Sequence, residues 1–379
     1  MRLTILQEKL KEGLALVGRI CSKSTTLPIL SNILFKVEKN FLILSATDLE
    51  VGIKWRSLIK MEEEGEAVIP NQTTFSLVSL SPNKAIKINS KNLQVFFECD
   101  NYQSTLKSLS PEEFPIIPLN IEGEYLKIPS QFFCQALSQI VNLTSTSTAK
   151  PEISGVYFIF QENLIKIVAT DSFRLGEKTI YLEKKVGTVK KQSLILPQKA
   201  ARELINIFGE KAGDLKIYFS SNQIVFESQM EETNVPQIQF TSRLIEGEFP
   251  NYQDIIPKKS ETQVSIPGKE FLNQVKSASV FSGKTNEIKL EINSKKGIVG
   301  ISSQSPDVGE YNSQIQAKIK GSDTKVAFNY RFLIDGLLNV NIDKEKEVVL
   351  ELTGEEGPAV LKSLSDQSYL YILMPIKKT

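Results

Sequence analysis

The sequence predicts an α+β fold built from three copies of one domain, each with antiparallel sheets and two helices. The first observation is an internal repeat, because a short apolar strand followed by a helical pattern occurs three times along the 379 residues. Ile5, Ile128 and Ile266 take the same place in the three strands, at offsets of 123 and 138 residues. A repeat of this length is the size of a domain, much longer than a solenoid unit. We therefore place the domain boundaries at residues 1–121, 122–258 and 259–379.

Composition is the second observation. The chain is 41% hydrophobic and long enough for about two to four domains that each bury a core. No apolar run approaches the length of a membrane span, and the start, MRLTILQEKLKEG, has neither an uninterrupted apolar segment nor a small-residue cleavage site. We therefore expect a cytoplasmic protein without a membrane segment.

The order of elements within each copy is the third observation. After the opening strand comes a helix whose apolar residues recur at helical spacing. These residues are Leu6, Leu10, Leu14 and Val17, then Phe133, Leu137 and Ile140, then Phe271, Val275 and Ala278. An alternating strand pair follows at 28–55, 152–182 and 286–303, and a further strand with a second helix at 66–80, 193–208 and 325–340. Alternating strands close each copy at 86–106, 215–229 and 348–363, which gives the order βαβββαβββ.

The reactive residue types limit the chemistry. Cys21, Cys99 and Cys134 are scattered without CxxC spacing, which is typical of reduced core thiols and not of disulfides or zinc sites. The chain has no histidine, so histidine-dependent triads and histidine metal sites are excluded. Phosphate-binding glycine motifs are missing as well.

Carboxylate chemistry with Mg²⁺ is what remains for an enzyme. Its candidates are Asp48 with Glu50, and Asp171. Asp48 and Asp171 lie 123 residues apart, at matching places where a strand runs into a turn. An aspartate at a turn commonly accepts hydrogen bonds from its own backbone, and this is the structural alternative to catalysis.

Five stretches, in order along the chain, resemble one family. They are TLPILSNILFKV (26–37), SATDLEVGI (45–53), VATDSFRLGEKTI (168–180), FTSRLIEGEFPNYQDIIP (240–257) and YLYILMPIKK (369–378). Together they are similar to the bacterial DNA polymerase III β subunit, the replicative sliding clamp. The resemblance implies that two three-domain subunits close head-to-tail into a ring around duplex DNA. It implies a processivity factor without catalytic residues, metal or cofactor.

DNA contact in such a ring is expected to be independent of sequence, from Lys and Arg to phosphates. The chain has 45 basic and 44 acidic residues, so a DNA-facing field must come from segregation of charge. Helices expected to face DNA carry Lys9, Lys11, Arg19, Lys199, Arg202, Lys269, Lys276 and Arg331. Loops that match family DNA contacts carry Lys23, Lys150 and Lys284. Ser24 stands where the family often has arginine, with Lys23 beside it as a substitute.

Ring closure, by the same resemblance, pairs an edge strand of the first domain with one of the third. These strands are expected at 102–107 and 306–311. The apolar centre would contain Leu106, Val280 and Phe281, and Lys107 would face Asp307 or Glu310. Ser104 replaces a large apolar residue of some relatives, which predicts a weaker interface.

The resemblance also implies a cleft between the second and third domains that takes a linear peptide from partner proteins. Expected partners are the polymerase III catalytic subunit, the clamp loader and repair polymerases. The matching residues are Ile153, Thr170, Ser172, Phe173, Arg174, Leu175, Pro250, Asp254, Ile255, Ile372, Leu373, Met374, Pro375 and Ile376. Ile153 and Leu175 also fit a core role. Phe173 replaces a frequent histidine, Asp254 lies where arginine can occur, and the chain ends in Lys377-Lys378-Thr379 without a closing hydrophobic residue.

Two other classes stay open at the level of sequence. One is a Mg²⁺-dependent nuclease or phosphodiesterase that uses Asp48 and Asp171, and the other is a monomeric DNA-binding scaffold.

Overall fold

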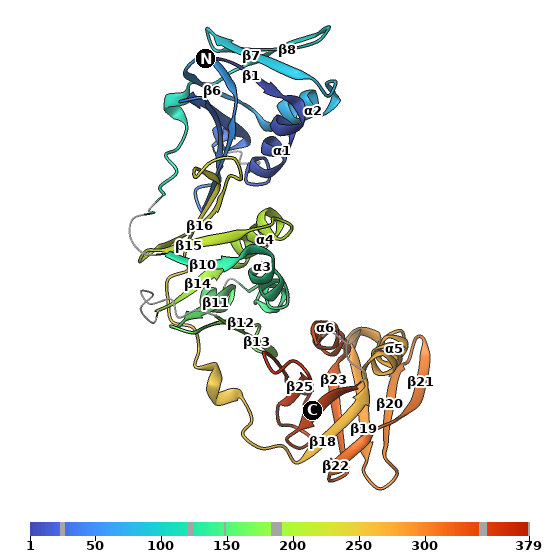
Figure 1. The fold of residues 1–379 in the computed structure, drawn as a ribbon. Helices are drawn as coiled ribbons and strands as arrows, with labels where there is room; N and C mark the ends of the chain where they lie inside the picture. Colours follow the sequence, from blue (N-terminus) through green and yellow to red (C-terminus); the bar gives the residue numbers. More distant parts are fainter. Residues whose placement is uncertain are drawn as a thin grey trace. The chain divides into compact units, whose positions relative to one another are not determined.

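The chain forms two units, which we describe separately. One contains residues 1–135 and 199–244, and the other contains residues 136–198 and 245–379. The computed structural model describes residues 1–22, 27–119, 121, 125–147, 149–182, 192–340 and 347–377 (Figure 1).

Each copy of the repeat contains two α-helices and at least eight strands within the described residues. The first copy consists of β1 (Arg2–Leu6), α1 (Gln7–Val17), β2 (Asn32–Glu38), β3 (Phe41–Thr47), β4 (Val51–Leu58), β5 (Lys60–Glu63), β6 (Gly65–Pro70), α2 (Asn71–Leu80), β7 (Ala85–Lys91), β8 (Gln94–Cys99) and β9 (Tyr102–Lys107). The second consists of β10 (Tyr125–Pro129), α3 (Ser130–Ser138), β11 (Gly155–Phe160), β12 (Leu164–Thr170), β13 (Arg174–Tyr181), β14 (Gln192–Pro197), α4 (Gln198–Phe208), β15 (Asp214–Phe219), β16 (Gln223–Gln229) and β17 (Pro236–Arg243). The third consists of β18 (Thr262–Pro267), α5 (Gly268–Ser279), β19 (Glu287–Asn293), β20 (Ile298–Ser305), β21 (Gly309–Gln316), β22 (Lys318–Gly321), β23 (Thr324–Asn329), α6 (Tyr330–Asn339), β24 (Glu347–Leu352), β25 (Ala359–Ser363) and β26 (Tyr369–Leu373).

The predicted order βαβββαβββ is wrong between the two helices of each copy. The structure has β11–β14 there in the second copy, and five strands in the first and third. The predicted strand pair at 28–55 is three strands, because the chain reverses at Lys39-Asn40, both with positive φ, and again between Thr47 and Val51. Alternation of apolar residues continues through such tight reversals, so it does not mark the ends of strands.

The prediction that the opening strands are equivalent is confirmed. Ile5, Ile128 and Ile266 are all buried in β1, β10 and β18. Leu6, however, is exposed at the N-cap of α1 and does not belong to the buried face of that helix. In Figure 1, α1 and α2 lie side by side in the first copy, as α5 and α6 do in the third.

Strand pairing joins neighbouring copies. In the first unit, a five-stranded sheet (β5-β1-β7-β8-β9) accompanies an eight-stranded sheet (β10-β15-β16-β17-β4-β3-β2-β6). The larger sheet is continuous because β17 of the second copy pairs with β4 of the first. In the second unit, β26 of the third copy pairs with β13 of the second inside a nine-stranded sheet, and β21-β20-β19-β23 forms another sheet.

No described helix is both long and apolar enough to span a membrane. The cysteines are free, with Cys99 and Cys134 buried and Cys21 half-buried.

Candidate functional site

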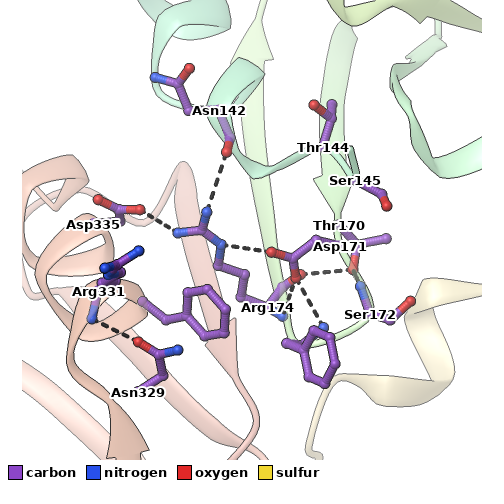
Figure 2. A network of polar contacts seen from close by, with 12 residues as sticks. Asn142, Thr144, Ser145, Thr170, Asp171, Ser172, Arg174, Asn329, Arg331 and Asp335 are labelled. Carbon is purple, nitrogen blue, oxygen red and sulfur yellow. Dashed lines mark hydrogen bonds and ion pairs between the residues drawn. The ribbon is translucent and has the colours of Figure 1, made fainter. Parts of the chain in front are cut away.

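The turn between β12 and β13 is the centre of the candidate site (Figure 2). We call residues 170–174 the Arg174 turn. Thr170 Oγ1 donates to the carbonyl of Arg174 (2.7 Å) and accepts from the Ser172 amide (3.1 Å). Asp171 Oδ1 accepts from the amides of Phe173 and Arg174, both at 3.0 Å. The turn therefore holds itself in place with its own side chains.

The same turn occurs in the first copy. Asp48 Oδ1 accepts from the amides of Glu50 (3.0 Å) and Val51 (2.8 Å). Leu49 and Ser172 both have positive φ, at 78° and 77°, which is the strain that the aspartate hydrogen bonds offset. The prediction that these aspartates bond to their own turns is confirmed.

The Arg174 guanidinium connects the turn to two other segments. Its Nε donates to Asp171 Oδ2 (3.0 Å), its Nη1 to Asp335 Oδ2, and its Nη2 to the carbonyl of Asn142 (3.4 Å). The guanidinium carbon also lies 4.6 Å from the centre of the Phe332 ring. Figure 2 shows these groups converging on one side chain, only 11% exposed. Arg174 thereby links the second copy to helix α6 of the third.

The C-terminal segment runs beside this turn. Strand β26 pairs with β13 so that Leu373 is opposite Arg174, and the Met374 amide then donates to the Phe173 carbonyl (2.8 Å). The Ile376 amide donates to the carbonyl of Ala327 (2.8 Å). The last described residues are therefore held against both the second and the third copy.

A linker at 249–256 lies against one face of the nine-stranded sheet that contains β13 and β26. Tyr252 is 3% exposed, and its hydroxyl donates to Glu177 Oε2 (2.5 Å), while Lys166 Nζ lies 2.8 Å from Glu177 Oε1. Tyr157 stacks on Phe249 with ring centres 4.6 Å apart. These contacts close the sheet face beneath the linker.

The predicted cleft residues divide into a buried and an exposed group. Those that are buried are Ile153, Thr170, Leu175, Ile372, Leu373 and Pro375. Leu175 and Ile372 share a core cluster with Tyr252, which agrees with the alternative that Leu175 is a core residue. The half-buried residues are Arg174, Met374 and Ile376, and the exposed ones are Ser172, Phe173, Pro250, Asp254 and Ile255.

Three contributors to the network were not predicted from sequence: Asn142, Phe332 and Asp335. Phe332 and Asp335 are three residues apart on α6 and so lie on one helix face, a spacing that fits a helix surface of any function. Asn142 accepts from Arg174 through its backbone carbonyl, and no side-chain pattern predicts a backbone acceptor.

Comparison with known proteins identifies the family. Family models for the DNA polymerase III beta subunit match residues 1–118 (N-terminal domain), 127–251 (central domain) and 253–377 (C-terminal domain). The chain belongs to the DNA polymerase III beta subunit family. It is 27% identical to the beta sliding clamp of Staphylococcus aureus over 94% of each chain, and 28% identical to that of Staphylococcus epidermidis over 94% of each.

Solved structures agree in fold. The DNA polymerase sliding clamp from Bacillus subtilis has a TM-score of 0.92 at 24% identity, with all of each chain covered. The DNA polymerase III subunit beta from Pseudomonas aeruginosa has a TM-score of 0.92 at 23% identity, again over all of each chain. A sliding clamp from that organism bound to griselimycin has a TM-score of 0.90 at 23% identity and the same coverage.

The family is the sliding-clamp processivity subunit, a non-catalytic protein of DNA replication. The nuclease alternative has no support in these comparisons. In the structure, Asp48 and Asp171 use one carboxylate oxygen for their own turns, and the other oxygen contacts Lys199 and Arg174, respectively. Membership in the family implies DNA, a polymerase and a second subunit as partners.

The basic residues predicted to face DNA are surface residues wherever the structure describes them. The exposed set is Lys9, Lys11, Arg19, Lys150, Lys199, Arg202, Lys269, Lys276, Lys284 and Arg331. Arg19 is paired with Glu203 (2.7 Å), and Lys199 with Asp48. Lys23 and Ser24 lie outside the described residues.

The strands predicted to close a clamp ring lie at sheet edges. Residues 102–107 form β9, at one edge of the five-stranded sheet, and the predicted 306–311 stretch includes the start of β21, an edge of the four-stranded sheet. Val280 is 65% exposed, and the Phe281 and Tyr311 rings stack with centres 6.0 Å apart. Of the other residues predicted at this interface, Leu106 is half-buried, whereas the charged residues Lys107, Asp307 and Glu310 are exposed.

Proposed function

We propose that this chain forms a head-to-tail homodimeric ring around duplex DNA in the cytoplasm and holds replication proteins there through short linear peptides. The peptide site is the Arg174 turn together with the C-terminal segment. The observation that carries this assignment is the hydrogen bond from the Met374 amide to the Phe173 carbonyl. It places Phe173, 62% exposed, next to the half-buried Met374, so apolar surface from two copies adjoins one fixed turn.

The chemistry of this surface suits a peptide with a hydrophobic anchor. Ile255, 45% exposed, is an apolar residue on the linker, while Asp254 adds a negative charge beside it. We therefore propose that preferred peptides lack an acidic residue opposite Asp254. The polymerase III catalytic subunit, the clamp loader and repair polymerases are the proposed sources of such peptides.

A fluorescent clamp-binding peptide titrated against variants tests the site. Deletion of residues 374–379 should weaken binding about tenfold or more, because burial of a large apolar side chain contributes roughly 1.5–3 kcal/mol. Met374→Ala is the cleaner change, because Pro375 is buried and the Ile376 amide bonds to Ala327, so deletion also removes contacts of the third copy.

Leu364→Ala is the matched control, since Leu364 is 58% exposed in the same copy and outside the proposed site. Asp254→Arg should restore binding of peptides with an acidic residue at the opposing position. Undiminished binding by folded Met374→Ala and by the deletion variant would place the partner site elsewhere.

The ring interface has support from the junctions inside the chain. At each junction, the closing strand of one copy pairs with the third strand after the first helix of the preceding copy: β17 with β4, and β26 with β13. By the same rule, β9 is the closing strand of the first copy and β21 the third strand of the last copy. Both are edge strands within the described chain. We propose that β9 of one subunit pairs with β21 of the other.

This rule also suggests a register. Ser242 lies opposite Val51 at the first junction. The motif around Ser108 matches that around Arg243, so Lys107 is equivalent to Ser242. Lys107 would then lie opposite Gly309, the first residue of β21, so its side chain would share a sheet face with Asp307 and not with Glu310, which makes Asp307 the proposed ion-pair partner.

A further inference from the structure

The first copy has a pocket at a place that polar contacts close in the second copy. The pocket, of about 680 Å³, lies between the outer face of the eight-stranded sheet and the linker that follows β9. Its floor is formed by cross-strand neighbours: Leu34, Ser45 and Lys54 in one row, and Ile43 with Arg56 in the next. We call it the Lys54 pocket. Its volume is within the usual range for small-molecule sites.

In the second copy, polar contacts close the position equivalent to this pocket. Strands β3 and β4 correspond to β12 and β13 at an offset of 123 residues, so Lys54 is equivalent to Glu177. Glu177 is 8% exposed and is satisfied by Tyr252 and Lys166. In the first copy, the linker residue matching Tyr252 is Ile117, which has no hydroxyl to donate. The polar network that seals the second copy is therefore absent, and a cation replaces the carboxylate.

The basic residues of the pocket differ in their ion pairs. Lys36 lies 3.2 Å from Glu38 and 3.1 Å from Glu66, so these two acids share one cation, and together with Glu112 the lining has three acids and three basic residues. No described carboxylate forms a salt bridge with Lys54 or Arg56. Lys54 makes no hydrogen bond to the described residues, and Arg56 donates to a neutral group, the Pro236 carbonyl (2.7 Å).

Burial lowers the pKa of Lys54, and the positive charges of Arg56 and Lys36 lower it further, against a smaller opposing effect of Glu38. Two cations thus lie side by side in a partly desolvated pocket, an arrangement that an anion would stabilise. The remaining acid of the lining, Glu112, is exposed on the linker.

The walls of the pocket are apolar. Phe114 and Ile117 are buried residues of the linker that share a cluster with Val68, while Ile116 of the linker is 92% exposed at the rim. We propose that the Lys54 pocket binds a small amphiphilic carboxylate, with its head group at Lys54 and Arg56 and its apolar chain against the linker. This site is independent of the proposed peptide site.

Calorimetric titration with octanoate as the probe, and with octanol as its uncharged counterpart, tests the inference. Lys54→Met keeps the length of the side chain and removes its charge, so octanoate binding should weaken about tenfold or more. Lys87→Met, at a lysine side chain 68% exposed on the other sheet of the unit, should leave octanoate binding unchanged. Octanol should bind more weakly than octanoate to the wild type and show no difference between the variants.

A measurement on the unchanged protein guards against a folding defect in the variant. Octanoate should protect Lys54 from acetylation, as judged by mass spectrometry, while Lys87 stays equally reactive. Equal octanoate binding by wild type and Lys54→Met, or no protection of Lys54, would overturn the proposal.

Discussion

Arg174 shows how one side chain can hold the proposed peptide site together. Its guanidinium reaches three acceptors and a ring face in different directions, which a lysine ammonium on a flexible stem cannot do with fixed geometry. Burial by itself would lower the pKa of Arg174, but nearby Tyr371 and the Asp335 and Asp171 carboxylates outweigh it and raise the pKa. The side chain therefore stays charged at any pH at which the protein is folded.

Arg174→Lys should destabilise the protein by roughly 2 kcal/mol, because buried hydrogen bonds to charged groups are lost and Asp335 loses its partner. Urea unfolding measures this change, and the same variant should bind the clamp-binding peptide less tightly. Arg331→Lys, on helix α6 with Asp335, is the control. Its unfolding midpoint should not move, since Arg331 is exposed. Identical midpoints for both variants would contradict a structural role for Arg174.

The two turn aspartates could be predicted from sequence, because an Asp at the end of a strand acts on residues two and three positions away. The ion pair between Arg174 and Asp335 could not, since 161 residues separate them and no periodicity connects them. The same holds for Lys54 in its pocket. Local hydrogen bonds follow from local sequence, whereas partners across copies depend on how the copies pack.

Thiol chemistry offers a second prediction at this scale. Burial raises the pKa of Cys134 to about 12, and that of Cys21 to about 12 despite an opposing backbone hydrogen bond. At pH 8, each should have about a thousandfold less thiolate than in the unfolded chain, and thiolate is the reactive form. Iodoacetamide labelling followed by peptide mapping should show both sites slow in the native protein and fast in urea. Comparable rates in the two conditions would contradict this.

At the scale of elements, close approach between helix and sheet explains where the chain needs glycine. A Cβ added at Gly336 of α6 would lie 2.5 Å from Tyr371 of β26, and one at Gly13 of α1 would lie 2.5 Å from Trp55 of β4. Both aromatic residues are fully buried. A helix therefore rests directly on an aromatic ring of the sheet in the first and third copies.

Gly336→Ala should destabilise the third copy by roughly 1–3 kcal/mol. In an exposed helix the same change would stabilise by about 1 kcal/mol, so the sign of the effect reports the contact with Tyr371. Thermal unfolding measures it, with Ser277→Ala at an exposed position of α5 as the control, which should be close to neutral. A rise in melting temperature for Gly336→Ala would show that the helix does not need this approach.

The repeat predicted the opening strands and the helices, but it undercounted the strands between the helices. Hydrophobic alternation indicates which residues face the core. Because it continues through two-residue reversals such as Lys39-Asn40, it does not show where a strand ends. The pairing of β17 with β4 was also beyond sequence reasoning, since edge strands look alike whether or not they are paired.

At the scale of the whole molecule, the proposed interface between β9 and β21 predicts which changes separate the subunits. Leu106→Ala combined with Lys107→Glu should weaken the dimer without unfolding the subunit, because both residues are on an edge strand and the cores lie elsewhere. Sedimentation over a range of concentrations measures dissociation. Lys60→Glu, on β5 at the opposite edge of the same sheet, is the control. An unchanged dimer in the double variant would rule out this edge.

Encirclement makes a prediction about salt. The protein should remain on circular duplex DNA through moderate salt and slide off once the circle is cut, because a topological link does not depend on counterion release. Gel filtration of loaded circles before and after cutting measures this. Equal loss from circular and linear DNA would leave the monomeric scaffold as the better account.

The strand pairing between copies has a consequence for breakage. If a protease cuts the linker at 115–119, β17 still pairs with β4 along Ile238–Ser242, so the two pieces stay joined by backbone hydrogen bonds. A nicked chain should then run as two fragments in denaturing gels and as one particle under native conditions. The backbone hydrogen bonds between β17 and β4 would therefore hold the fragments together after the peptide bond between them is cut.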